Sequence, residues 1–471
     1  MDVTAATSAK VEAASFRDPD SRVFYADGIV YRALSKRGAE QWERVAATDV
    51  YARLLDQGKV VATERVDGDV SEGVLAGAAA LLRHDRIPFV SYPYEWTFGM
   101  LQDAALLQLE VLREGLGEDV VSKDATPYNI QWRGTRPQFV DVGSFEVLEP
   151  GEPWIGYRQF CMLFLYPLLL QAYKGIAFQP WLRGALDGIT PEQCRRVMSL
   201  RDVARPGVFT HVYLHSRLER RHADTNRDVR AELRRAGFKK ELIVANLRRL
   251  EKVIRRLEPR ASASAWTGYR ATDSYTQDDA ARKEEFVQAA VAARRRRLVW
   301  DLGANEGRFA RIAAANADYV VAVDGDAAVA DALYRTLKAE RAETILPLTM
   351  NLVDPSPALG WRGRERSSLA DRGTPDLTLC LALVHHVAIS GNVPPRSFLE
   401  WLRSLGTALV VEFPTLDDPQ VQRLVVAKRE RVHPDYNRPS FEQALGELFD
   451  VETTLELAGG NRVLYRARPK G

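Results

Sequence analysis

Three groups of polar residues in the 471-residue sequence have types and spacings that could perform chemistry. The first is a glycine-containing turn with a later acid, formed by Asp301, Gly303, Ala304, Asn305, Gly307 and Asp324. Glycines after a strand let backbone amides approach a ligand closely, and an acid ending the next strand can hold both hydroxyls of a ribose. This group predicts a site for a nucleoside-containing cofactor.

The second group could move a proton. His385 and His386 follow an apolar run, and Glu412 ends the next one. Histidine has a pKa near neutrality and is the usual base for a hydroxyl nucleophile. We therefore expect His385 or His386 to act as the base and Glu412 to orient the acceptor. The alternative is that one histidine packs under the other and neither does chemistry.

The third group of polar residues points to a different reaction. Asp124, Asn129 and Asp141 supply an Asp-x4-Asn followed by an Asp-x-Gly. Phosphoryl transfer uses such a set, with one Asp accepting the hydroxyl proton and an Asn and a second Asp holding Mg²⁺ on the phosphates. Asn129 and Asp141 would be the magnesium ligands, and Mg-ATP the second cofactor.

The elements that carry the first two groups lie after residue 275. Short β-rich runs alternate there with helical segments, which predicts an α/β fold with a doubly wound parallel sheet. The expected strands are 298–302, 319–324, 344–349, 377–383 and 408–413. A last pair, 451–456 and 463–466, is joined through Gly459-Gly460-Asn461 and predicts an antiparallel terminal hairpin.

The third group belongs to a different kind of region. Asp27-Gly28 separates two β-rich runs, which predicts a hairpin, and apolar stripes at 101–116 and 242–257 predict helices. This α+β region ends at a small-residue stretch, 261–265, typical of a linker. We expect a flexible N-terminus at 1–20, a first domain at 21–260, a linker at 261–275 and a second domain at 276–471.

Composition excludes several classes of protein. Hydrophobic residues make up 46% and charged residues 27%, so disordered and fibrous chains are disfavoured. The net charge of +2 disfavours nucleic acid as the partner, although residues 216–260 carry a local excess of Lys and Arg. No secretory signal precedes the chain's first domain, and the longest apolar run, 160–170, is short for a membrane span. A cytoplasmic protein with a small-molecule or glycan acceptor is expected.

The Asp301-x-Gly303 turn with Gly307 resembles motif I of class I S-adenosylmethionine (SAM)-dependent methyltransferases, over roughly residues 270–471. The resemblance implies a Rossmann-like fold and SAM as cofactor. Its methionine part would lie among the motif residues Asp301, Gly303, Ala304, Asn305 and Gly307, and its ribose at Asp324. Asn351 and Leu352 stand where this family contacts adenine, although many members have Asp in place of Asn351.

Residues 20–260 resemble the protein kinase and aminoglycoside phosphotransferase superfamily through Asp124, Asn129 and Asp141. The glycine-rich phosphate loop is missing, and Arg32 and Glu43 are the best substitutes for the paired Lys and Glu of that fold. Three interpretations stay open: an active kinase, a degenerate kinase fold that binds the acceptor, and a chance match.

The order of the two regions resembles a bacterial family that includes nodulation host-specificity proteins. The leading hypothesis is a methyltransferase acting on a hydroxyl of a sugar or other small polyhydroxylated acceptor, with the kinase-like half aiding its recognition. The alternatives are a bifunctional kinase-methyltransferase that uses Mg-ATP and SAM, and an RNA-directed methyltransferase or non-catalytic scaffold.

Overall fold

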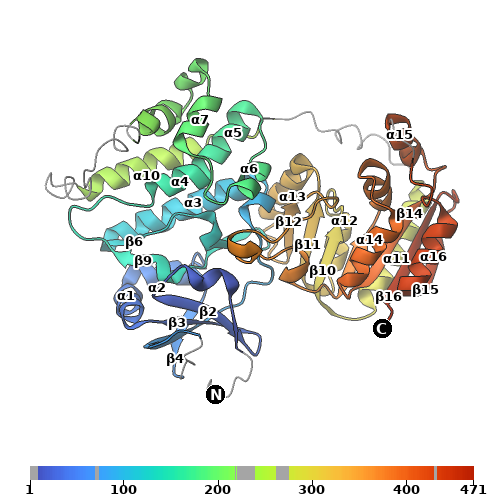
Figure 1. Cartoon of the computed structure of the whole chain (residues 1–471), viewed down its shortest axis with the longest axis horizontal. Helices are drawn as coiled ribbons and strands as arrows, with labels where there is room; N and C mark the ends of the chain where they lie inside the picture. The colour runs from blue at the N-terminus through green and yellow to red at the C-terminus, as the bar shows by residue number, and fades with distance from the viewer. Residues whose placement is uncertain (1–8, 69–73, 218, 220–238, 261–274, 429–431) are drawn as a thin grey trace. The chain divides into compact units, whose positions relative to one another are not determined.

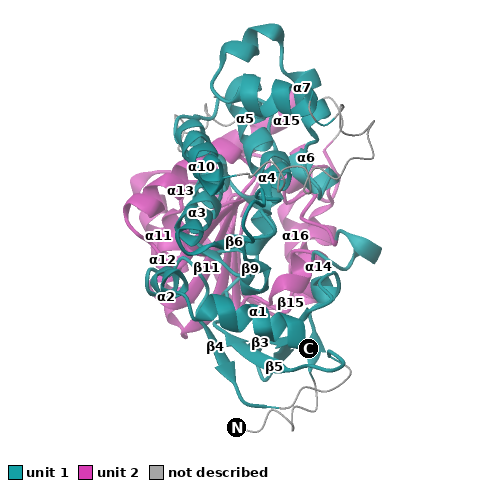
Figure 2. Cartoon of the chain, turned by 90° about the vertical axis from the view of Figure 1, so that its left-hand side faces the viewer, with its two compact units in different colours: residues 1–132, 137–262, 359–366 teal, residues 133–136, 263–358, 367–471 magenta. Residues whose placement is uncertain are grey.

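The computed structural model describes residues 9–68, 74–217, 219, 239–260, 275–428 and 432–471. The chain divides into two compact units (Figure 2). Unit 1 is Met1–Trp132, Pro137–Ser262 and Leu359–Arg366, and unit 2 is Arg133–Arg136, Ala263–Ala358 and Ser367–Gly471. The expected linker 261–275 lies outside the described residues except for Tyr275. Within the described part of the chain, no helix is both long and apolar enough to cross a membrane.

Unit 1 begins with a five-stranded antiparallel sheet in the order β1-β2-β3-β5-β4. Its strands are Lys10–Val11, Ser21–Ala26, Ile29–Leu34, Thr63–Val66 and Ala80–His84, numbered β1 to β5. The predicted hairpin joins β2 to β3, and its two turn residues, Asp27 and Gly28, have φ of +50° and +79°. Positive φ at both positions is what a tight hairpin turn requires. Helices α1 (Lys36–Ala46) and α2 (Asp49–Asp56) lie between β3 and β4 in sequence.

The rest of unit 1 is mainly helical (Figure 1). The two predicted apolar stripes are α3 (Phe98–Gly115) and α10 (Lys240–Ile254), which pack against each other. The apolar run at 160–170 is a buried helical segment with one π-helical turn at Cys161–Leu165, between α4 (Tyr157–Phe160) and α5 (Tyr166–Lys174). Helices α6 (Gln179–Gly184) and α7 (Pro191–Val197) follow.

Two small strand pairs in unit 1 support the third polar group. Strand β6 (Val120–Ser122) pairs with β9 (Phe145–Val147), and β7 (Ile130–Arg133) with β8 (Arg136–Phe139). Asp124 follows β6, Asn129 precedes β7, and Asp141 follows β8. The short strands therefore fix the three polar residues at neighbouring strand ends.

Unit 2 is built on a mixed seven-stranded sheet in the order β12-β11-β10-β13-β14-β16-β15. The strands are β10 Arg296–Leu302, β11 Ala317–Asp324, β12 Ile345–Thr349, β13 Leu377–Cys380, β14 Ala408–Pro414, β15 Phe449–Glu456 and β16 Arg462–Pro469. The first five are parallel, and β16 pairs antiparallel with both β14 and β15. The predicted antiparallel hairpin at the edge of a parallel sheet is confirmed.

One predicted strand boundary is wrong. The run expected to extend to Leu383 leaves the sheet after Cys380. Ala382 has a φ of +50°, and its backbone N–H donates to the side-chain carboxylate of Glu412 at 2.8 Å instead of to a backbone carbonyl of the neighbouring strand. The left-handed residue turns the chain away from the ladder, because extended pairing requires negative φ.

Helices flank the sheet, and the core between them is aliphatic (Figure 1). They are α11 (Gln277–Ala292), α12 (Arg308–Ala314), α13 (Ala327–Ala339), α14 (Pro395–Ser404), α15 (Pro419–Ala427) and α16 (Arg438–Leu448). The central strands are apolar on both faces, as a sheet covered on both sides requires. The carboxyl ends of β10 to β14 consequently meet at one edge of the sheet.

Candidate functional site

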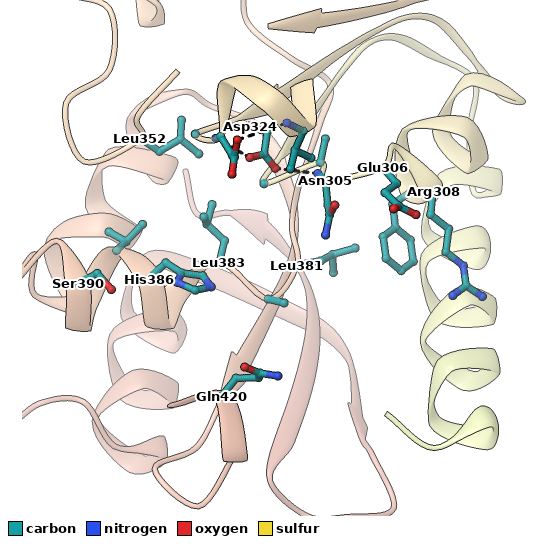
Figure 3. A pocket seen from close by; sticks show the side chains of 18 of the residues that line it. Asn305, Glu306, Arg308, Asp324, Leu352, Leu381, Leu383, His386, Ser390 and Gln420 are labelled. Carbon is teal, nitrogen blue, oxygen red and sulfur yellow. Dashed lines mark hydrogen bonds between the residues drawn. The ribbon is translucent and has the colours of Figure 1, made fainter. Parts of the chain in front are cut away.

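A cavity of about 1310 Å³ opens at the carboxyl ends of the parallel strands (Figure 3). Seven of the residues singled out from the sequence line it: Gly303, Ala304, Asn305, Asp324, Asn351, Leu352 and His386. Sites for small ligands commonly measure roughly 300–1,000 Å³, so this volume has room for a cofactor and a second molecule. Ligands of open α/β sheets bind at this edge.

Four other expected site residues are buried around the cavity and are not among its described lining residues: Asp301, Gly307, His385 and Glu412. Asp301 is the last residue but one of β10, Gly307 precedes α12, His385 follows β13 and Glu412 lies in β14. These four residues lie behind the cavity wall and support it.

The turn after β10 depends on its glycines. Gly303 and Gly307 have φ of +82° and +76°, and Asn305 between them has +48°. The N–H groups of Gly303 and Ala304 both donate to the Val323 carbonyl, at 2.8 and 2.9 Å, which locks the turn onto β11. A Cβ on Gly307 would meet Leu333 Cδ1 at 2.6 Å, a distance that requires the leucine to move. Glycine is the residue that tolerates this backbone without strain.

Asp324 presents its carboxylate at the cavity from the end of β11 (Figure 3). One oxygen accepts the N–H of Asn305 and the other the N–H of Asp326, both at 2.8 Å. Burial raises the pKa of this carboxyl, while the two backbone N–H groups favour its charged form. Each carboxylate oxygen has a second lone pair, so the fixed group can accept from two vicinal hydroxyls. The donor and acceptor set fits a ribose.

Asp301 is a buried carboxyl with an unmet hydrogen-bonding capacity. It is 2% exposed, and no partner is found for its Oδ2 atom among the described residues. Burial, and then the nearby charge of Asp324, raise its pKa to about 7. A buried polar atom without a partner is uncommon, and it marks places where a water or ligand completes the site. The Oδ2 atom of Asp301 can therefore take part in one further hydrogen bond behind the cavity wall.

The structure separates the roles of the two histidines. Their rings are in contact, with centroids 4.0 Å apart and planes tilted by 39°, but His385 is fully buried whereas His386 lines the cavity (Figure 3). Burial, and then the charge of Arg462, lower the pKa of His386 to about 4. His386 is neutral at physiological pH, so one of its ring nitrogens can accept a proton. Of the pair, His386 is the residue with access to a ligand.

Glu412 is committed to other protein groups. Its carboxylate accepts from the Tyr275 hydroxyl and Lys283 Nζ, each at 2.7 Å, from Arg462 at 3.2 Å and from the Ala382 N–H. Burial opposes its ionisation, but the charges of Lys283 and Arg462 prevail and lower its pKa to about 2. A fully paired carboxylate is a poor base and a good anchor. Glu412 holds Ala382, and with it the turn that carries His386.

Arg462 extends this network to the loop after β14. Its guanidinium donates to both carboxylate oxygens of Asp418, at 2.7 and 3.1 Å, and also to the Tyr275 hydroxyl. Asp418 caps the N-terminus of α15, where Gln420 lines the cavity. The network therefore ties α11, β14, β16 and α15 to the same wall.

The sequence pattern did not single out Lys283, Arg462 or Gln420. Asp279 and Lys283 stand four residues apart on α11, a spacing that is typical of an exposed ion pair, so the sequence gives no sign that both are buried. Arg462 and Gln420 carry no local pattern either.

In unit 1, Asp141 is paired with Arg32 at 2.9 Å. Burial, and then the charge of Asp141, raise the pKa of Asp124. Glu43, expected to take the place of the helix glutamate, pairs instead with Arg65. The prediction that Arg32 and Glu43 replace the paired Lys and Glu is therefore wrong. The Arg32 guanidinium pairs with Asp141 and also donates to Ser21 at 2.9 Å.

This arrangement does not fit a magnesium site. A guanidinium already neutralises Asp141, the carboxylate that would carry most of the metal's charge. Within the described ranges, no group of three or more His, Cys, Asp or Glu side chains is placed to hold a metal ion. No step is therefore assigned to Mg-ATP.

Comparison with known proteins yields a relative along nearly the whole chain. Nodulation protein NoeA of Rhizobium meliloti (strain 1021) is 31% identical over 455 residues, which cover 96% of this chain and 95% of that protein. No family model matches.

Solved structures match about two fifths of the chain. N-methyltransferase NodS from Bradyrhizobium japonicum WM9, in complex with S-adenosyl-L-homocysteine, is 13% identical and covers 45% of this chain and 94% of that chain, with a TM-score of 0.31. Magnesium protoporphyrin IX methyltransferase from Synechocystis PCC 6803 is 16% identical and covers 44% and 95%, with a TM-score of 0.31.

Proposed function

This chain belongs to the family of nodulation protein NoeA, and on that basis we propose that it is a SAM-dependent methyltransferase. The acceptor is a hydroxyl of a sugar or another small polyhydroxylated molecule. SAM supplies an activated methyl group, and the enzyme mainly aligns the acceptor oxygen with it.

The observation that carries the proposal is the position of Asp324. Its carboxylate stands at the edge of the cavity, held by two backbone N–H groups, directly beside the Gly303–Gly307 turn. A fixed pair of acceptor oxygens next to a turn of this kind is the recognition device for a nucleoside. Asn351 and Leu352 line the same cavity on the side where adenine would lie.

His386 is the proposed base. It is neutral, borders the cavity, and takes the acceptor's hydroxyl proton on a ring nitrogen as the oxygen becomes the nucleophile. Leu381 and Leu383 beside it exclude water, and Ser390 and Gln420 offer neutral hydrogen-bonding groups to the acceptor. Glu412 is a positioning residue in this proposal, because it holds the turn that carries His386. His385 packs against the His386 ring and has no role in the reaction.

The kinase-like half contributes to recognition of the acceptor rather than to phosphoryl transfer. The Arg32–Asp141 ion pair favours this form of the proposal over a bifunctional enzyme, because it leaves no unneutralised carboxylate pair for magnesium. Asp124 and Asn129, both half-buried, are the hydrogen-bonding groups that a hydroxylated ligand would meet there.

Calorimetry with S-adenosylhomocysteine (SAH), the product form of the cofactor, tests the proposal. We expect one molecule to bind per chain and Asp324→Ala to weaken binding at least about tenfold, as expected for loss of a hydrogen bond to a charged group. Asp318→Ala is the matched control, since Asp318 on the same strand is exposed and pairs with Arg295. No SAH binding by the wild-type chain would refute the proposal. In a separate experiment, label transferred from SAM to a component of a cell extract would identify the acceptor.

A further inference from the structure

Lys283 is a buried ammonium group on the wall of the cavity, and the function proposed above gives it no role. It comes from α11, is 5% exposed and lines the cavity. Its Nζ lies 5.0 Å from the centroid of the Phe309 ring and 4.6 Å from that of Tyr275. Phe309 opens the helix that follows Gly307, so the ammonium lies on the side of the cavity formed by the glycine turn.

The hydrogen bonds of this ammonium leave capacity for a ligand. It donates to Tyr275 at 2.9 Å and to Glu412 at 2.7 Å, and these are its two oxygen partners among the described residues. An ammonium group has three N–H donors. One donor therefore remains for an acceptor in the cavity.

The charges around Lys283 point to the chemistry of that acceptor. Lys283 forms an ion pair with one carboxylate, Glu412, which is also paired with Arg462. Arg462 has a second carboxylate partner, Asp418. Burial lowers the pKa of Lys283 in spite of Glu412, so the ammonium is incompletely compensated. A second carboxylate would complete it, because buried charges require paired, hydrogen-bonded partners.

We propose that Lys283 binds the α-carboxylate of the cofactor's methionine part and thereby selects a cofactor that has one. This inference rests on the proposed function. It assigns Lys283 a specificity role, separate from the ribose contact of Asp324 and from the base, His386.

The test compares two ligands by calorimetry: SAH, and 5′-methylthioadenosine, which keeps the nucleoside and lacks the amino-carboxylate. Lys283→Met preserves the length of the side chain and removes its charge. We expect this variant to lose about ten- to a hundredfold in affinity for SAH and to change less than about twofold for methylthioadenosine. Lys283→Arg should recover part of the loss. Arg282→Met, at a neighbouring position on the same helix that does not line the cavity, is the control and should bind both ligands as the wild type does.

A second measurement on the wild-type chain keeps the inference testable if Lys283→Met does not fold. SAH should bind at least about tenfold more tightly than its decarboxylated analogue, which keeps the amine. Equal affinities, or an equal loss of both nucleosides in Lys283→Met, would overturn the role of Lys283. A wild-type chain that binds neither SAH nor methylthioadenosine would instead refute the proposed function itself.

Discussion

The two adjacent histidines differ in what they can contribute, and this difference can be measured. His386 borders the cavity, while His385 is fully buried and no partner is found for either of its ring nitrogens within the described residues. We expect His386→Ala to lower turnover about 10²- to 10⁴-fold with unchanged SAH affinity, the usual size of a general-base contribution. His385→Leu should keep its turnover and its melting temperature, because replacing an unsatisfied polar group by an apolar one is close to neutral.

The pH dependence of turnover follows from the same residue. The base must be unprotonated, and the pKa of His386 is lowered to about 4, so the active form persists across neutral pH. Turnover should be flat from about pH 6 to 8 and fall only as the pH approaches the pKa. A profile with a midpoint near 6.5, or wild-type turnover in His386→Ala, would contradict the assignment of the base.

At the scale of elements, the turn between β10 and α12 is the part most sensitive to a single methyl group. A Cβ on Gly307 would meet Leu333 at 2.6 Å, and the residue has a φ of +76°. We expect Gly307→Ala to reduce the free energy of unfolding by about 1–3 kcal/mol, through backbone strain and overpacking together. Gly325→Ala is the control, since its Cβ would find one neighbour at an ordinary 3.7 Å. Equal unfolding curves for the two variants in urea would contradict this account.

The ion pairs of Glu412 join α11, β14 and β16, so their loss should lower the free energy of unfolding. Glu412→Gln leaves Lys283 and Arg462 facing a neutral group, and breaking one partner of a buried pair costs about 3–5 kcal/mol. Glu400→Gln, in an exposed pair with Arg396, should change stability by less than about 1 kcal/mol.

The network also predicts how wild-type stability depends on pH. The folded-state pKa of Glu412 is depressed to about 2, below an unfolded value of about 4.3. Its contribution is therefore complete above the unfolded value and is lost as the pH falls toward 2. The difference in the free energy of unfolding between the wild type and Glu412→Gln should be largest at neutral pH and smaller in acid. A difference that grows in acid would show that Glu412 is not held ionised.

Elements of unit 2 were predictable from the sequence, whereas the contacts behind the cavity wall were not. The five parallel strands are mostly apolar. Gly303 directly follows β10, and Asp324 ends β11. The network of Tyr275, Lys283, Glu412 and Arg462 joins positions far apart in the sequence, and only the order of strands in the sheet brings them together. The early end of β13 shows the same limit, because the left-handed Ala382 depends on a carboxylate from the next strand.

At the scale of the whole molecule, the division into two units separates the SAM proposal from the ATP proposal, because the cavity lies in unit 2 and the Asp124, Asn129 and Asp141 group lies in unit 1. Asp124, Asn129 and Asp141, the three residues that resemble a kinase motif, are all present. The Arg32 guanidinium, however, forms an ion pair with Asp141 at 2.9 Å. A cationic side chain in this position supplies the charge that a divalent metal would bring.

We therefore expect the full-length chain to bind SAH but to give no Mg²⁺-dependent heat with ATP, and EDTA to leave methyl transfer unchanged. Asp141→Ala provides the check, because it removes the carboxylate that a metal would need and leaves Arg32 unpaired. Under the methyltransferase proposal this variant binds SAH as the wild type does. Heat from Mg-ATP that disappears in Asp141→Ala would favour the bifunctional enzyme, and the absence of heat from both ligands would favour a non-catalytic scaffold. The Arg32–Asp141 ion pair predicts that SAH alone binds. A metal on Asp141 would displace the guanidinium of Arg32, which is buried and would lose its carboxylate partner.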